Sequence, residues 1–246
     1  MVNFHEQIIP LKPLYSPVSE KSSYKTYIWG EEGPLVLLAH GWSGRASQMA
    51  VLAAPLIKAG FKVMTFDAFA HGASPGKQSN LAEFKQIIAH IYKKQGPFQA
   101  IIGHSLGGIA ACLAVSEGVK TEKLITIGSP ATMDYIVESF CLTLGARLSS
   151  GQYLFDYVKK MTGLDPDYFS LAKIVGKLDN EGLIIHDRDD KESAYEQALL
   201  VAENWKGGRL VSTSGLGHQR ILRDKEVIRT IVDFVSVKSS VEMMTV

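Results

Sequence analysis

Short apolar runs alternate with longer amphipathic stretches through most of the 246 residues. The short runs are continuously apolar, mostly rich in β-branched residues, and bordered by Gly, Pro or charged residues. This pattern is typical of strands that are buried on both faces of a parallel sheet. The predicted strands cover residues 35–39, 62–66, 100–102, 124–127, 183–185 and 209–212.

The longer stretches carry apolar residues at helical spacing. In residues 47–59, Met49, Leu52 and Leu56 fall on one face, and Gly60 follows as a stop signal. Similar patterns predict helices over residues 81–94, 106–117, 193–205 and 225–237. Because strands and helices alternate, we expect a mostly parallel, doubly wound α/β sheet with right-handed crossovers. Residues 4–10 and 24–29 are candidates for an antiparallel edge of this sheet.

One long segment, residues 133–178, contains no strand pattern. Its predicted helices are rich in aromatic and aliphatic side chains and cover residues 135–144, 152–161 and 169–175. An excursion of this length is uncommon as a plain loop. We therefore expect a helical cap over the C-terminal edge of the sheet, with an ordinary crossover helix and a long loop as the alternative. The predicted organisation is a core of residues 1–132 and 179–246 with a cap insertion at 133–178.

Composition and charge narrow the class of partner. The formal net charge is +1 and no long run of Lys or Arg occurs, so neither nucleic acid nor an anionic membrane is expected as the main partner. The two cysteines, Cys112 and Cys141, lie among apolar residues and are expected to be buried free thiols. No signal peptide and no apolar stretch long enough for a membrane span are visible, so the expected compartment is the cytoplasm.

A candidate nucleophile lies at Gly103-His104-Ser105-Leu106-Gly107, between a predicted strand and a predicted helix. This is the G-x-S-x-G pattern in the context that its chemistry requires. A chain that turns directly from strand to helix brings the residues two before and two after the serine too close together for side chains, which explains both glycines. The turn exposes the Ser105 hydroxyl and leaves the Leu106 N–H free at a helix N-terminus to donate to an anion.

A second motif, His40-Gly41-Trp42-Ser43-Gly44, follows the strand at residues 35–39. Together with the serine motif it resembles the α/β-hydrolase superfamily, in which an H-G-x turn supplies part of the oxyanion hole. The resemblance implies that the backbone N–H groups of Trp42 and Leu106 bind the oxyanion.

Two further features belong to the same resemblance. Residues 67–74 are similar to a D-x-x-G-H-G-x-S segment, with Ala70 in place of the usual Gly, and are expected to form a turn near the mouth of the site. His40, Gly41 and His104 lie beside the reacting groups and are expected to contact the substrate. The resemblance covers residues 20–130 and 180–237.

A serine nucleophile needs a histidine base, and in this fold the base follows the serine and the acid along the chain. Only His186 and His218 follow Ser105. His186 closes a predicted strand, whereas His218 lies in a turn before the last predicted helix. The superfamily carries its catalytic histidine in such a turn, so the resemblance assigns the base to His218.

The orienting acid is expected just after the strand at residues 183–185, where Asp187, Asp189 and Asp190 compete. In many relatives this strand is followed by H-G-x-x-D, and the last Asp is catalytic. That register selects Asp190, with Asp189 and Asp187 as alternatives. Asp187 replaces the usual Gly and is a departure from the pattern.

These residues predict a serine hydrolase that needs no metal and no other cofactor. The leading substrate is a small-molecule carboxylic ester or thioester with a small to medium, partly apolar acyl group, because the predicted cap could roof an apolar pocket. Hydrolysis of a C–C bond or an amide by the same residues is an alternative, as is a receptor or signalling protein with slow turnover. A dehalogenase is disfavoured because Ser105 stands where that class has Asp.

Overall fold

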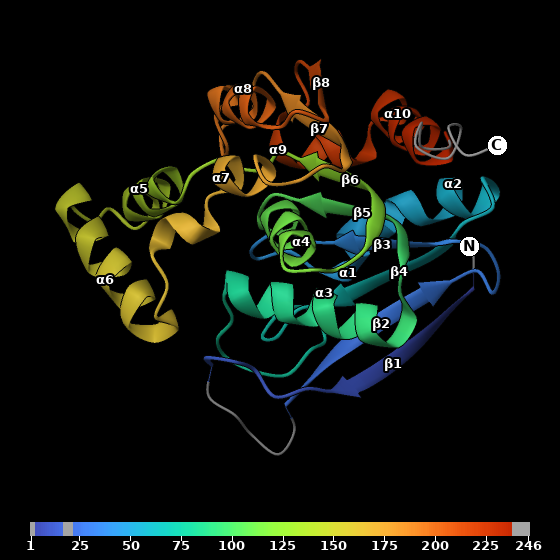
Figure 1. Ribbon diagram of the computed structural model, residues 1–246, viewed down its shortest axis with the longest axis horizontal. Coiled ribbons are helices and arrows are strands. Elements are labelled where there is room, and N and C mark those ends of the chain that lie inside the picture. The colour runs from blue at the N-terminus through green and yellow to red at the C-terminus, as the bar shows by residue number, and fades with distance from the viewer. Residues whose placement is uncertain (1–2, 17–21, 238–246) are drawn as a thin grey trace.

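An eight-stranded sheet forms the centre of the molecule in the computed structural model, which describes residues 3–16 and 22–237 (Figure 1). Its strand order is β1-β2-β4-β3-β5-β6-β7-β8. The first two strands are antiparallel to their neighbours, and β4, β3, β5, β6, β7 and β8 run parallel. The strands are β1 Phe4–Pro10, β2 Ser23–Trp29, β3 Leu35–Ala39, β4 Lys62–Asp67, β5 Phe98–His104, β6 Thr121–Ile127, β7 Glu181–Asp187 and β8 Gly208–Thr213. The predicted sheet and its antiparallel edge are confirmed.

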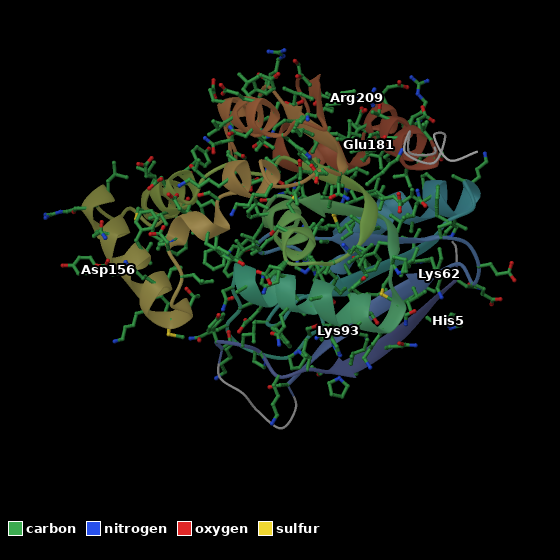
Figure 2. All side chains as sticks on the ribbon, viewed as in Figure 1. His5, Lys62, Lys93, Asp156, Glu181 and Arg209 are labelled. Carbon is green, nitrogen blue, oxygen red and sulfur yellow. The ribbon has the colours of Figure 1, made fainter. Side chains whose placement is uncertain are left out.

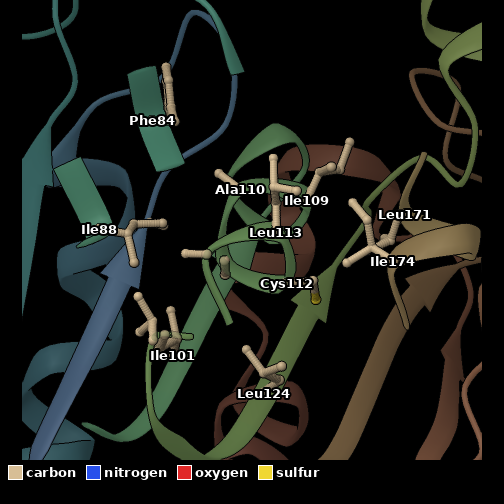
Figure 3. Packing of buried hydrophobic residues seen from close by; sticks show 14 of the residues in the cluster. Phe84, Ile88, Ile101, Ile109, Ala110, Cys112, Leu113, Leu124, Leu171 and Ile174 are labelled. Atoms are coloured by element: carbon tan, nitrogen blue, oxygen red, sulfur yellow. The ribbon is translucent and has the colours of Figure 1, made fainter. Parts of the chain in front are cut away.

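Alternate side chains of the central strands enter two separate buried clusters, one on each face of the sheet. Leu37 and Ile101 belong to the cluster on one face, whereas Val36 and Ile102 belong to the cluster on the other. The first cluster lies beneath α3 (Leu81–Gln95), α4 (Leu106–Ser116), α7 (Leu171–Val175) and α8 (Tyr195–Asn204), and the second beneath α1 (Ala46–Met49), α2 (Ala53–Lys58) and α10 (Lys225–Ser236). Figure 3 shows the first cluster, in which α4 lies over the strand residues Ile101 and Leu124. Burial on both faces explains why these strands are continuously apolar. The helices are α1 Ala46–Met49, α2 Ala53–Lys58, α3 Leu81–Gln95, α4 Leu106–Ser116, α5 Met133–Thr143, α6 Gly151–Thr162, α7 Leu171–Val175, α8 Tyr195–Asn204, α9 Gly217–Arg220 and α10 Lys225–Ser236.

The first predicted helix is broken into three pieces. A 3₁₀ turn, η1 (Ala50–Leu52), separates α1 from α2. Pro55 lies in the first turn of α2, where its missing N–H removes the bond that a continuous helix would make back to Val51. The prediction of one helix over residues 47–59 was therefore wrong in its continuity, although Gly60 ends it in a left-handed conformation as expected.

The segment at residues 133–178 is helical, and its first and last helices both contribute residues to the buried core. Two 3₁₀ turns, η2 (Leu148–Ser150) and η3 (Pro166–Phe169), connect α5 to α6 and α6 to α7. Leu171, Ile174 and Val175 of α7 join the same buried cluster as α4 (Figure 3). Met133, Val137 and Cys141 of α5 belong to this cluster as well. Beyond α4 and α7, α5 and α6 form the left-hand end of the molecule in Figure 1.

Candidate active site

Ser105 occupies a strained turn between β5 and α4. Its backbone has φ 52° and ψ −122°, a region that residues with a side chain rarely adopt. A Cβ atom at Gly103 would lie 2.4 Å from the Gly108 Cα, and one at Gly107 would lie 2.4 Å from the Ala39 carbonyl oxygen. Both glycines are therefore required by close backbone approach, as the sequence predicted.

Two hydrogen bonds hold this turn against the end of β6. The Ser105 N–H donates to the Ile127 carbonyl oxygen over 2.8 Å. The Ser129 hydroxyl donates to the Ser105 carbonyl oxygen, also over 2.8 Å. With the backbone fixed in this way, the strain at Ser105 is maintained by the surrounding structure.

The turn after β3 lies against Ser105. A Cβ atom at Gly41 would lie 2.9 Å from the Ser105 Cβ, so Gly41 allows the two turns to touch. Within residues 3–16 and 22–237, neither the Trp42 N–H nor the Leu106 N–H donates a hydrogen bond to a protein acceptor. Two free backbone donors beside a serine hydroxyl are suited to binding an oxyanion. The Trp42 indole is half-exposed and packs edge-on against His71, with ring centroids 5.3 Å apart.

His218 and Asp190 form a buried hydrogen-bonded pair. The distance from His218 Nδ1 to Asp190 Oδ2 is 2.7 Å, and both residues are more than 90% buried. The other carboxylate oxygen, Asp190 Oδ1, accepts the N–H groups of Glu192 and Ser193, each over 2.9 Å. Burial by itself would raise the pKa of Asp190, but the hydrogen bonds from His218 and from the backbone outweigh it and lower that pKa. Asp190 is therefore an anion that holds the His218 ring by its Nδ1–H.

The pair lies next to the serine turn. His104, the residue before Ser105, packs its ring on the His218 ring with centroids 4.5 Å apart, and its Nε2–H donates to the His218 carbonyl oxygen over 2.9 Å. Among the described residues the Ser105 hydroxyl makes no direct hydrogen bond to His218. Such bonds are often long in a free enzyme and shorten when the substrate binds.

The other two aspartates, Asp187 and Asp189, accept hydrogen bonds from the turn that precedes His218. Asp187 Oδ2 accepts the Leu216 N–H over 3.1 Å and the Thr213 hydroxyl over 2.6 Å. Asp189 Oδ2 accepts the Gly215 N–H over 2.7 Å. Neither carboxylate is hydrogen-bonded to the His218 ring, so the geometry favours Asp190 among the three candidate acids.

His40 and His104 are buried beneath the site. His40 is completely buried, its Nδ1–H donates to the Gly41 carbonyl oxygen over 2.7 Å, and its Nε2 accepts the Ala68 N–H over 3.0 Å. This arrangement requires a neutral ring, and burial lowers the pKa of His40 to about 4. Burial likewise lowers the pKa of His104 to about 3. Rings with so little exposed surface cannot contact a substrate in this conformation, so the expectation of substrate contact at His40 and His104 is not met.

Several neighbours of the site were not recognised from the sequence. Gly128 (φ 60°) leaves room for the acid–base pair, because a Cβ atom there would lie 3.1 Å from His218 Nδ1. Glu192 Oε2 lies 3.8 Å from His218 Nε2 on the exposed rim. The only sequence signal for Gly128 and Ser129 is their position after β6, because the carboxyl ends of parallel strands meet at one edge of the sheet.

The described residues contain no group of three or more His, Cys, Asp or Glu side chains placed to hold a metal ion. In the same ranges, no helix combines the length and apolar character needed to cross a membrane.

Comparison with known proteins identifies the family. The family model Hydrolase_4, described as serine aminopeptidase, S33, matches residues 30–153, which is half of the chain. The chain belongs to this α/β-hydrolase family. The matched region contains the Trp42 turn and the Ser105 turn, whereas Asp190 and His218 lie beyond it.

Relatives of this α/β-hydrolase include two curated enzymes. The sn-1-specific diacylglycerol lipase ABHD11 of Xenopus tropicalis is 34% identical over 116 residues, 44% of this chain and 36% of that protein. Protein phosphatase methylesterase 1 of Rattus norvegicus is 29% identical over 99 residues, 37% of this chain and 26% of that protein. The chain thus spans about a third of the length of these curated relatives.

Similarity of fold to solved structures extends over nearly the whole chain of this α/β-hydrolase. A solved structure of an esterase from Exiguobacterium antarcticum superposes with a TM-score of 0.68, covering 92% of this chain and 99% of that one. Its sequence identity is 17%, so this likeness concerns the fold alone.

The buried histidines predict a loss of stability in mild acid. An unfolded histidine takes up a proton near pH 6.5, whereas folded His40 and His104 resist protonation down to about pH 4 and about pH 3. Between these values the unfolded state binds more protons, so the free energy of unfolding falls as the pH decreases from about 6.5 towards 4. Urea titrations at a series of pH values measure the free energy of unfolding across this range. His104→Gln should reduce the slope of that free energy against pH by up to about 1.4 kcal/mol per pH unit. The exposed control His5→Gln should leave it unchanged, and an unchanged slope in His104→Gln would contradict the prediction.

The hydrogen bonds accepted by Asp187 and Asp189 predict a local effect on the turn that precedes His218. Asp187→Ala removes the acceptor of the Leu216 N–H, and a hydrogen bond to a charged group contributes roughly 1.5–3 kcal/mol. We expect amide exchange at Leu216 to accelerate on the order of tenfold or more, measured by residue-resolved hydrogen exchange. Asp179→Ala, which removes an exposed aspartate elsewhere, is the matched control. Equal exchange in both variants would show that Asp187 does not hold the turn.

Proposed function

We propose that the protein is a serine hydrolase that cleaves a carboxylic ester or thioester through Ser105, His218 and Asp190. The observation that carries this proposal is the buried 2.7 Å hydrogen bond between Asp190 and His218, beside a serine held at φ 52°. A fixed carboxylate, an imidazole with the tautomer this bond requires and a serine on a tight turn are the three parts of nucleophilic acyl transfer.

In the first half of the proposed reaction, Ser105 attacks the carbonyl carbon while His218 Nε2 takes the hydroxyl proton. The Asp190 carboxylate keeps the other ring proton on Nδ1 and stabilises the imidazolium that forms. The N–H groups of Trp42 and Leu106 bind the oxyanion, because they are the unpaired backbone donors on either side of the serine. The imidazolium then protonates the leaving alcohol or thiol, which departs and leaves Ser105 acylated.

In the second half, water replaces the leaving group. His218 takes a proton from that water, whose oxygen attacks the acyl carbon. The bond from that carbon to Ser105 Oγ then breaks, the His218 imidazolium returns the proton to Oγ, and the acid product departs. Glu192 lies 3.8 Å from His218 Nε2 on the rim of the site. The other two aspartates act by holding the turn of residues 214–217, so they position the base without contacting it.

The substrate class rests on the surroundings of the site. The exposed face of Trp42 and the aliphatic and aromatic residues of the segment 133–178 favour a small to medium, partly apolar acyl group. We propose this segment as the cap, with α5 and α6 as its projecting part. The names of the curated relatives, a lipase and a methylesterase, designate enzymes that act on esters. Amide hydrolysis is the second candidate, because the matching family model is described as a serine aminopeptidase.

Labelling with a fluorophosphonate probe tests the nucleophile. The wild type should be labelled, Ser105→Ala should lose labelling completely, and the exposed control Ser47→Ala should retain it. Labelling that survives in Ser105→Ala would place the nucleophile elsewhere. A panel of p-nitrophenyl esters of graded chain length, acyl thioesters and aminoacyl arylamides then separates the two candidate functions. Turnover confined to the arylamides would replace the ester proposal with the amide one.

Substitution of the aspartates tests the acid. Asp190→Asn keeps the size of the side chain but removes the charge that stabilises the imidazolium, so kcat should fall on the order of 10³- to 10⁴-fold. Asp189→Asn should cost less than about tenfold, because Asp189 binds only the Gly215 N–H. The measurement is steady-state hydrolysis of the best p-nitrophenyl ester. A larger loss in Asp189→Asn than in Asp190→Asn would move the acid to Asp189.

A further inference from the structure

The carboxylate of Asp67 is buried without a cationic partner. Asp67 is the last residue of β4 and is 3% exposed. In the part of the chain that the structure describes, no Lys, Arg or His side chain forms an ion pair with it. Taking a carboxylate out of water is costly unless hydrogen bonds replace the lost water. The groups that donate to Asp67 therefore indicate what this carboxylate does.

Three donors from separate segments reach the Asp67 carboxylate. Its Oδ1 accepts the N–H of Ala46, the first residue of α1, over 2.7 Å. Its Oδ2 accepts the Ala73 N–H over 2.9 Å and the hydroxyl of Tyr27 in β2 over 3.0 Å. A Cβ atom at Gly72 (φ 52°) would lie 2.3 Å from the Asp67 Cγ, so the turn after β4 wraps closely around the carboxylate. Asp67 thus joins the start of α1 to the turn after β4 and to β2.

The segment that follows β3, residues 40–46, is attached to the end of β4 and the turn after it at both of its own ends. At its start, His40 Nε2 accepts the Ala68 N–H over 3.0 Å. At its end, the Ala46 N–H donates to Asp67. Because both ends are fixed, the backbone between them has little freedom to move.

The backbone between these two attachments is strained. Ser43 has φ 56°, in the left-handed region that a residue with a side chain rarely adopts. One backbone hydrogen bond closes the turn, from the Gly44 N–H to the Gly41 carbonyl oxygen over 3.0 Å. Strain of this kind persists only where the surrounding structure maintains it. The N–H of Trp42, one residue before Ser43, therefore keeps its direction only while the turn is held.

These contacts lie at the edge of the sheet that carries the candidate site. Lys62, Glu181 and Arg209, at or next to the starts of β4, β7 and β8, all lie in the right-hand half of Figure 2. The strands from β4 to β8 run parallel, so the end of β4 lies at the opposite edge, together with the ends of β3 and β5. A Cβ atom at Gly41 would lie 2.9 Å from the Ser105 Cβ, so the segment after β3 touches the serine turn.

We propose that Asp67 is a positioning residue for the oxyanion hole. Its carboxylate holds residues 40–46 in place and so fixes the direction of the Trp42 N–H. Asp67 acts through this segment rather than on the substrate. The inference rests on the proposed function, since it takes the Trp42 N–H as an oxyanion donor. A donor that is fixed before the reaction needs no reorientation when the negative charge forms, so a loosened turn would slow the chemical step.

Steady-state hydrolysis of the best p-nitrophenyl ester tests this role. Asp67→Ala leaves the Ala46 N–H without its acceptor. Ala46→Pro removes that N–H at the first position of a helix, where proline is well tolerated after the extended Arg45. Each variant should lower kcat on the order of tenfold to hundredfold, as a misplaced catalytic group does. KM should stay within about threefold, because the oxyanion forms only after the substrate has bound.

Two control variants break other hydrogen bonds of the same region. The Ser74 hydroxyl donates to the Asp67 carbonyl oxygen over 2.6 Å and accepts the Lys25 N–H over 2.8 Å, so Ser74→Ala removes two bonds without touching residues 40–46. Tyr27→Phe removes one donor from the carboxylate and leaves the other two. Both controls should keep kcat within about threefold of the wild-type value.

Hydrogen exchange separates this inference from the proposed function. The Gly44 N–H donates within the turn, so its exchange rate reports whether the turn stays closed. Exchange at Gly44 should accelerate on the order of tenfold or more in Asp67→Ala and Ala46→Pro, and it should not change in Ser74→Ala. A wild type that is inactive on every substrate, with accelerated exchange in Asp67→Ala, would reject the proposed hydrolysis and retain Asp67 as the residue that holds the turn.

Three results would overturn the inference. One is a kcat in Asp67→Ala and Ala46→Pro that is no lower than in Ser74→Ala. Another is a raised KM with an unchanged kcat, which would assign Asp67 to substrate binding. The third is an unchanged exchange rate at Gly44. Circular dichroism establishes that each variant is folded, and Ala46→Pro decides the matter if Asp67→Ala is not.

Discussion

Direct contact between backbones around Ser105 is the constraint on which the rest of the structure depends. The turn after β3, the end of β5 and the first turn of α4 approach so closely that Gly41, Gly103 and Gly107 have no room for a side chain. This contact holds Ser105 in its strained conformation and brings the Trp42 turn beside it. The three segments meet because β3, β5 and β6 are neighbours in the sheet.

The fold could be predicted from the sequence wherever one local pattern decided it. Buried parallel strands are continuously apolar, and each was recognised, although the ends of β5, β6 and β7 extend further into mixed sequence. The break between α1 and α2 was missed because the apolar spacing continues through it while Pro55 interrupts the backbone bonds.

Residues of the candidate site that belong to a motif could be proposed from the sequence. Gly103 and Gly107 follow from the geometry of a strand that turns into a helix, and the order of Ser105, Asp190 and His218 follows from the chain order of the fold. Burial of His40 and His104 was not predictable, because both lie inside motifs whose neighbours face the substrate. Gly128 was missed for a different reason: its requirement for small size comes from residues about 60 and 90 positions away, Asp190 and His218.

The segment at the end of β7 supplies the carboxylate that binds the His218 ring. It also supplies the carboxylates that accept hydrogen bonds from the turn before His218. Asp190 binds the ring, while Asp187 and Asp189 bind the Leu216 and Gly215 amides of the preceding turn. The acid and the base therefore share one anchoring point and shift together when β7 shifts. In evolutionary terms, position 187 is expected to vary together with position 213, because the Thr213 hydroxyl donates to the Asp187 carboxylate. A relative with glycine at position 187 must secure its histidine turn by another route, so that glycine and this turn sequence are not expected to occur together.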